Sequence, residues 1–285
     1  MSKFLTAQRK NFPSLKRRTQ GKPLTYFDGP AGSQVPRQVI KAIEYYYLAS
    51  NANTGGAFLT SRETDALLQD TRSVVATFLG SSGGNTISFA ANMTTLNYSL
   101  SKAIGRSMHK GDEIVVTQLD HEANRGPWLA LREQSIIVNE VLLKPDGTLD
   151  YDDFRRKITK RTRLVAVGIA SNALGTVNDI AALRDRVREA GAWLLLDAVH
   201  YAPHFLVDVG ALDADFLLCS AYKFYGPHVG ILYAREGMLD KLETDRLRTQ
   251  YQSAPYRIET GTLNHAAIEP RKSSAAGLSG RAGPY

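Results

Sequence analysis

Seven short apolar runs alternate with segments of helical periodicity, and this alternation constrains the fold more than any other feature of the chain. The runs lie at residues 86–90, 113–116, 136–142, 164–169, 193–196, 215–219 and 229–234. Strands that are apolar at nearly every position are typical of a parallel sheet covered on both faces. The pattern therefore predicts an α/β fold, a mostly parallel sheet with helices on both faces.

The segments between these runs predict the helices that cover the sheet. Apolar residues at helical spacing predict helices at residues 36–49, 62–79, 92–104, 124–134, 151–158 and 179–190. Together, residues 25–268 make up one large domain. Residues 269–285 are small, polar and rich in glycine, so we expect a loose tail there.

The net charge of +7 is concentrated at the start of the chain. Residues 1–22 contain seven basic residues and no acid, whereas the rest contains 28 basic and 28 acidic residues. Residues 1–24 are therefore predicted to form a basic arm, which could bind a polyanion or act as a targeting segment, but which we expect to pack on its own domain. The neutral body argues against a nucleic-acid partner.

Two further absences restrict the class of protein. No stretch approaches the roughly 20 apolar residues that a membrane span requires. Cys219 is the single cysteine, which excludes an intramolecular disulfide and indicates a reducing compartment, so we expect a cytoplasmic protein.

Polar residues follow several of the predicted strands, at the edge where α/β sheets bind ligands. Asp197 follows the run at 193–196, Ser220 follows the run at 215–219, and Lys223 comes three residues later. Asn92 opens a helix whose first N–H groups, including that of Met93, can hold a phosphate. Pyridoxal phosphate (PLP) requires a lysine, an acid and a phosphate cup of this kind.

Other interpretations exist for single residues of this set. Asp197 could cap a helix, and Lys223 alone would be a surface lysine. His200 and His204 faintly suggest a metal site, but Pro203 argues against one regular helix that presents both, so no metal is expected. The combination favours the cofactor.

Several motifs, in order along residues 12–268, resemble the class V aminotransferase family, which includes cysteine desulfurases and selenocysteine lyases. They are Tyr26 to Gly32 (YFDGPAG), Asp120 to Asn124 (DHEAN), Ser171 to Thr176 (SNALGT), Leu195 to His200 (LLDAVH), Ser220 to Pro227 (SAYKFYGP) and Arg257 to Asn264 (RIETGTLN). The resemblance implies the fold type I architecture of PLP enzymes, an amino-acid substrate and a homodimer.

The resemblance also implies roles for residues around the cofactor ring. Lys223 would form the Schiff base and later carry the proton, and Asp197 would pair with the pyridinium nitrogen. His121 would stack on the ring. Asn172 would reach the phenolate or the substrate carboxylate, and His200 stands near the phenolic oxygen, where the family usually has glutamine.

A second group is implied around the phosphate. Ser220 and the backbone at Asn92 and Met93 would hold it, and Thr262 would reach the phosphate of the partner subunit. Tyr222 replaces the histidine that desulfurases commonly have before the lysine.

The resemblance stops near residue 268, whereas family chains continue into a small C-terminal domain, so we expect that domain to be missing. It normally supplies the arginine that binds the substrate carboxylate and, in desulfurases, the cysteine that accepts sulfur. Cys219 falls inside a predicted strand and is expected to be a buried hydrophobic residue. We therefore expect a desulfurase-like PLP enzyme with impaired turnover. Transamination, β-elimination, epimerisation and a non-catalytic, PLP-binding or dimerising remnant remain open, because the scaffold does not choose between them.

Overall fold

A seven-stranded sheet forms the centre of the computed structural model, which describes residues 3–269. Its strand order is β3-β9-β8-β7-β6-β4-β5. The strands are β3 (Ile87–Ala90), β4 (Glu113–Thr117), β5 (Ile137–Val141), β6 (Thr162–Gly168), β7 (Trp193–Asp197), β8 (Phe216–Ser220) and β9 (Gly230–Ala234). Only the pairings of β9, with β3 and β8, are antiparallel among those in this sheet of the described chain. The predicted fold class is confirmed, and each predicted apolar run overlaps one strand.

The helices also follow the predicted positions closely. They are α2 (Arg37–Ala49), α3 (Leu59–Phe78), α4 (Met93–Arg106), α5 (Glu122–Leu129), α6 (Tyr151–Lys157) and α7 (Ile180–Ala190), with the short α8 (His265–Ile268) near the end of the described chain. One predicted helix, 124–134, is wrong in its bounds. The α-helix begins earlier because His121 caps it, and from Ala130 to Gln134 it tightens into a 3-10 turn that ends at Ser135 in the left-handed region.

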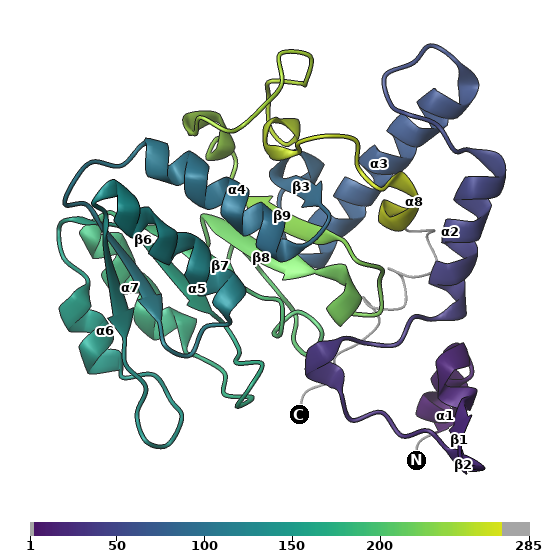
Figure 1. Cartoon of the computed structure of the whole chain (residues 1–285), viewed down its shortest axis with the longest axis horizontal. Helices are drawn as coiled ribbons and strands as arrows, with labels where there is room; N and C mark the ends of the chain where they lie inside the picture. The colour runs from purple at the N-terminus through teal and green to yellow at the C-terminus, as the bar shows by residue number, and fades with distance from the viewer. Residues whose placement is uncertain (1–2, 270–285) are drawn as a thin grey trace.

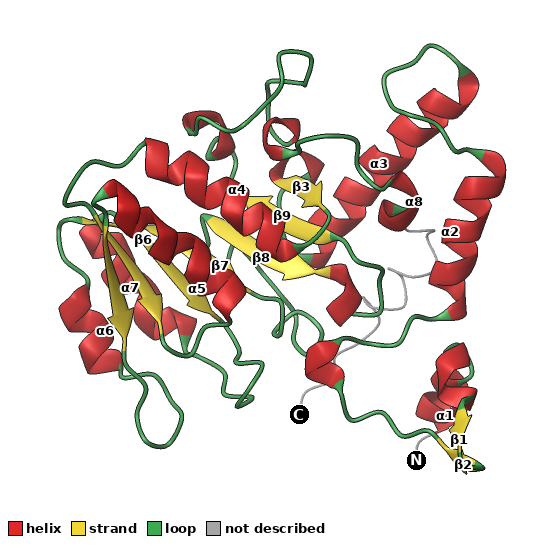
Figure 2. Cartoon of the chain, in the orientation of Figure 1, coloured by secondary structure: helices red, strands yellow, loops and turns green. Residues whose placement is uncertain are grey.

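Both faces of the sheet are covered, which explains why its strands are apolar at successive positions. In β7, Leu194 and Leu196 belong to one hydrophobic cluster, which includes Leu183 of α7. The intervening Leu195 belongs to the other cluster, which includes Leu100 of α4. Figures 1 and 2 show the strands lying between helices, with α4 and α5 crossing one face.

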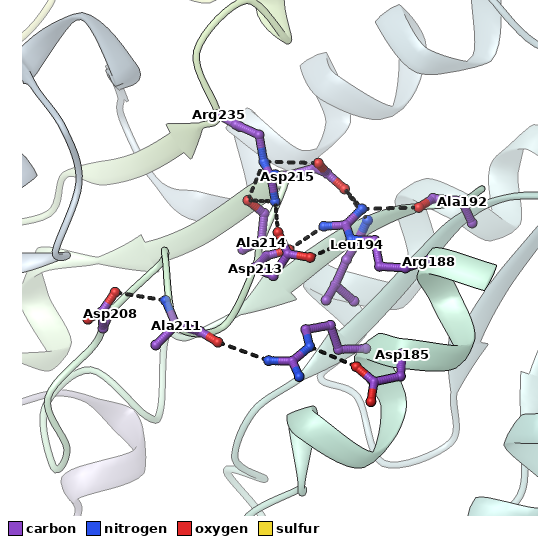
Figure 3. A network of polar contacts seen from close by, with 11 residues as sticks. Asp185, Arg188, Ala192, Leu194, Asp208, Ala211, Asp213, Ala214, Asp215 and Arg235 are labelled. Carbon is purple, nitrogen blue, oxygen red and sulfur yellow. Dashed lines mark hydrogen bonds and ion pairs between the residues drawn. The ribbon is translucent and has the colours of Figure 1, made fainter. Parts of the chain in front are cut away.

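A network of ion pairs closes the edge of the sheet where the parallel strands β7 and β8 begin (Figure 3). Arg188 of α7 contacts Asp213 at 2.7 Å and Asp215 at 2.6 Å. Asp215 also accepts a hydrogen bond from the backbone N–H of Leu194 at 2.8 Å and pairs with Arg235, which follows β9. These contacts join α7 to three strands, so the charged groups at this edge have structural partners.

The N-terminal segment contains α1 (Lys3–Arg9) and a two-stranded hairpin, β1 (Arg18–Thr19) and β2 (Lys22–Pro23), which is separate from the main sheet. Figure 1 shows it beside α2 at the lower right. The division at residues 24 and 25 remains a prediction, and all of the predicted tail except Glu269 lies outside the described residues. None of the helices within residues 3–269 is long and apolar enough to cross a membrane.

Candidate active site

A cavity of about 660 Å³, including its open mouth, lies at the carboxyl ends of β6, β7 and β8. Ten residues were expected to form a cofactor site, and the cavity brings eight of them together. They are Met93, His121, Asn172, Asp197, His200, Ser220, Tyr222 and Lys223. The parallel direction of these strands places their carboxyl ends, and the loops that follow, at the same edge.

Asp197 is the last residue of β7 and its side chain is buried, with 7% of its surface exposed. One carboxylate oxygen accepts the N–H of Val199 at 2.8 Å, and turns rather than a helix follow, so the helix-capping interpretation does not hold. Burial raises the pKa of Asp197 to about 7; the charge of Asp120 also raises it, while the Val199 hydrogen bond and Lys223 lower it. Within residues 3–269 no cation forms an ion pair with this carboxylate, so a cationic ring nitrogen suits the position.

Asp120 is a second acid of the cavity, and the sequence reasoning assigned it no role. It accepts hydrogen bonds at 2.9 Å from both the backbone N–H and the hydroxyl of Thr117, and another from the N–H of Gly168. Burial raises its pKa to about 6, although these hydrogen bonds lower it. The only sequence signal was its position directly before His121, after a predicted strand.

Lys223 lies on a short 3-10 turn that directly follows β8. It is half-buried, and its Nζ donates to the carbonyl of Pro30 and lies 4.8 Å from the centre of the Tyr222 ring. Tyr222 in turn stacks on His228, with ring centres 4.6 Å apart. Lys223 thus lines the same cavity as Asp197, which favours the cofactor interpretation over that of a surface lysine.

The first turn of α4 forms part of the cavity wall. Met93 and Thr94 line the cavity, and the first N–H groups of a helix have no partners within it, so they favour an anion. The buried Ser220 lines the same cavity. Gly230 of β9 allows the start of α4 to lie close to the sheet, because a Cβ at this position would overlap the Asn92 carbonyl. This wall fits a phosphate group.

His121 and Asn172 follow β4 and β6, respectively, and both line the cavity. The Nδ1 atom of His121 accepts the N–H of Ala123 at 3.1 Å, which caps α5. That bond restrains the orientation of the ring.

His200 lies at the junction of this cavity and a wider one, which extends toward the N-terminal segment. Its Nδ1 atom is buried and has no hydrogen-bond partner within the described chain. Burial, followed by the nearby His204 and Lys223, lowers the pKa of His200. A neutral imidazole with an unused nitrogen suits an oxygen of a bound ligand.

Two predicted site residues do not line the cavity. Asn92 is the N-cap of α4, and its side-chain oxygen accepts the N–H of Thr95 at 2.9 Å. Thr262 is exposed on the loop before α8. Its proposed contact with a partner subunit remains a prediction.

Comparison with known proteins agrees with this geometry. The aminotransferase class-V family model matches residues 25–274, and the chain belongs to this family. A cysteine desulfurase of Enterobacter sp. is 36% identical over 276 residues, which cover 91% of this chain and 68% of that protein. One of Synechococcus elongatus is 34% identical, with 90% of this chain and 44% of that protein covered. The expected family resemblance is confirmed.

Solved structures show the same similarity. The cysteine desulfurase of Thermococcus onnurineus superimposes with a TM-score of 0.83 at 30% identity, covering 92% of this chain and 68% of that one. A cysteine desulfurase of Escherichia coli gives a TM-score of 0.82 at 28% identity, with the same coverage. The chain thus spans from about half to about two thirds of the length of these relatives.

Proposed function

We propose that this chain binds PLP in the cavity and acts on an amino acid, with cysteine as the first candidate. The single observation that carries the proposal is the placement of Asp197 and Lys223 in one cavity whose lining includes the first turn of α4. A buried carboxylate, an amine and an anion-binding helix end match the ring nitrogen, the aldehyde and the phosphate of one cofactor. The family's chemistry and the names of the relatives support the substrate class.

When bound, PLP supplies an electron sink that stabilises negative charge at the substrate's α-carbon. Asp197 would hold the ring nitrogen in its cationic form, because a buried carboxylate is stabilised by an adjacent cation. Met93, Thr94 and Ser220, which line the cavity, would hold the phosphate. His121 would contact the ring, and the Nζ atom of Lys223 would carry the proton to and from the substrate carbon.

A second candidate activity rests on the state of Cys219. The chain contains one cysteine, and it is fully buried in β8. Burial, with a smaller effect of Asp197, raises the pKa of its thiol far above the usual range. A thiol in that state is a poor sulfur acceptor. This favours release of sulfur by direct elimination over transfer to Cys219.

Reductive labelling tests cofactor binding. The chain, incubated with PLP and then borohydride, should carry the cofactor on the peptide that contains Lys223, as measured by mass spectrometry. Lys223→Ala should lose the label, whereas Lys144→Ala, at an exposed position outside the cavity, should keep it. Label on another lysine of the wild-type chain would refute the assignment.

Product analysis separates the two activities. With cysteine as substrate, desulfuration leaves alanine, whereas elimination leaves pyruvate. If the buried thiol takes no part, Cys219→Ala should form the same product as the wild-type chain, in the same amount. Loss of sulfide release in Cys219→Ala, with the fold retained, would show instead that this thiol accepts sulfur.

We also propose that the chain forms a homodimer in the cytoplasm. Leu48, Leu59 and Tyr251 are 80%, 62% and 64% exposed, and Tyr251 lies near Gly55 of the loop between α2 and α3. Exposed apolar side chains of this size favour a protein interface. Sedimentation should give a dimer for the wild-type chain and a monomer for Leu48→Glu. The unpaired Cys219 suits a reducing compartment.

A further inference from the structure

The acid Asp120 has contacts that differ from those of the other cavity residues. Its carboxylate bridges two neighbouring parallel strands: Oδ2 accepts from Thr117, the last residue of β4, and Oδ1 accepts from the N–H of Gly168, the last residue of β6. Both strands end at the cavity. Asp120 therefore fixes the separation of two strand ends at the place where the site is built.

Gly168 leaves the space that the Asp120 carboxylate occupies, because it has no side chain. A Cβ at that position would lie 2.9 Å from Oδ1 of Asp120, which is closer than real Cβ atoms approach. The Gly168 carbonyl is also held, because the side chain of Asn178 donates to it at 2.7 Å. The backbone at the end of β6 is thus restrained on both sides, and it pairs with Asp197 in β7.

Asp120 is also linked to the two residues that would contact the cofactor ring. Asp120 directly precedes His121, the N-cap of α5. The hydrogen bond from Thr117 to the Asp120 side chain therefore helps to position the start of that helix. Gly168 stands opposite Asp197 in the β6–β7 register. The two carboxylates interact electrostatically, and no ion pair to a cation neutralises Asp120 within the described residues.

We propose that Asp120 is a positioning residue of the active site, which braces the ends of β4 and β6 and places a second negative charge near Asp197. The brace holds His121 and Asp197 at a constant separation. The charge favours a cation at the position that Asp197 faces, because two carboxylates attract a ring cation more strongly than one. This inference rests on the proposed cofactor, so its test includes a measurement that needs no PLP.

The first measurement uses the full chain prepared without PLP. The ¹³C resonance of the Asp197 carboxyl is followed with pH in the wild-type chain and in Asp120→Asn. Burial is the main cause of the raised pKa of Asp197, and the charge of Asp120 adds to it. The other titratable residues that line the cavity, Lys223, His121, His200 and Tyr222, are the same in both chains. The Asp197 midpoint should therefore fall in Asp120→Asn.

The second measurement is the affinity for PLP. Loss of an orienting partner behind a ligand weakens binding by about 10- to 100-fold in metal sites, and we expect about tenfold for PLP in Asp120→Asn. Asp215→Asn is the matched control. Asp215 is also a buried carboxylate that accepts a strand N–H, but it lies at the opposite edge of the sheet (Figure 3). Asp215→Asn should lower the stability of the chain, but it should change neither the pH midpoint of Asp197 nor the affinity for PLP.

A further variant covers the case in which Asp120→Asn does not fold. Thr117→Val keeps the shape and the backbone N–H but removes one hydrogen bond to Asp120. Thr117→Val should lower the pH midpoint of Asp197, as Asp120→Asn does, but by a smaller amount. An unchanged midpoint in the folded variant overturns the inference, as does unchanged PLP affinity. If the wild-type chain binds no PLP, the proposed function fails, and the midpoint alone then decides whether Asp120 acts on Asp197.

Discussion

Arg72 of α3 and Glu259 form a buried, two-pronged ion pair, with both N–O distances at 2.7 Å. The guanidinium also donates to the carbonyl of Ile87, and the carboxylate accepts the N–H of Phe89, so the pair is anchored to β3. Residues 187 positions apart are thereby joined. The contact holds the segment that leads to Thr262 against the body of the domain.

Removing one partner of this pair should strongly destabilise the chain. Glu259→Leu leaves a buried guanidinium without its counter-charge, which costs about 3–5 kcal/mol. Urea unfolding should show this loss, and the double variant with Arg72→Met should recover part of it. Asp245→Ala, which breaks the exposed pair with Arg106, should cost under about 1 kcal/mol. An equal loss in both single variants would contradict the interpretation.

The buried acids should make stability depend on pH. Burial raises the pKa of Asp120 to about 6 and that of Asp197 to about 7. A carboxyl whose pKa is raised by folding stabilises the fold fully below its unfolded value, 3.8, and this contribution is lost as pH rises through the folded value.

The difference in unfolding free energy between Asp197→Asn and the wild-type chain isolates this effect from that of His200. The effect of His200 on stability has the opposite sign, because burial lowers its pKa. Without PLP, Asp197→Asn should become steadily more stable relative to the wild-type chain between pH 4 and pH 7, by at most about 1.4 kcal/mol per pH unit. Asp152→Asn, at an exposed position in α6, is the control. Urea unfolding at a series of pH values measures the difference, and a constant difference for Asp197→Asn would refute the assignment.

The thiol of Cys219 should be inert in the folded chain. It is fully buried in β8, and burial raises its pKa. A thiol reagent at pH 8 should therefore label it only after unfolding, on the timescale of the unfolding reaction. Rapid labelling under native conditions, monitored by absorbance, would show that β8 opens locally or that the residue is accessible.

Gly230→Ala should disturb the phosphate-binding wall. Its new methyl group would collide with the backbone at Asn92 and Met93 and displace the first turn of α4. We expect a stability loss of about 1–3 kcal/mol and weaker PLP binding. Gly29→Ala, at a glycine with open space around it, is the matched control. Equal PLP affinities in the two variants would show that the α4 terminus does not hold the phosphate.

Local sequence patterns were enough to predict the strands, most of the helices and the residues that lie at the strand ends. Strand and helix periods are local properties, and burial on both faces forces the apolar runs seen in β7 and β8. Because parallel strands end at one edge, Asp197, Ser220 and Lys223 could be assigned to one site before any contact was known.

Which strand ends are neighbours, and what lies between them, depends on contacts between distant segments. The order β7-β6-β4 brings Asp120 near Asp197, and no local period encodes that order. Asn92 uses its side chain as a cap of its own helix, and Thr262 is exposed on a loop outside the cavity. Hydrophobic burial is non-directional and makes the layers, whereas hydrogen bonds such as Asp120 to Gly168 require a defined geometry between distant segments.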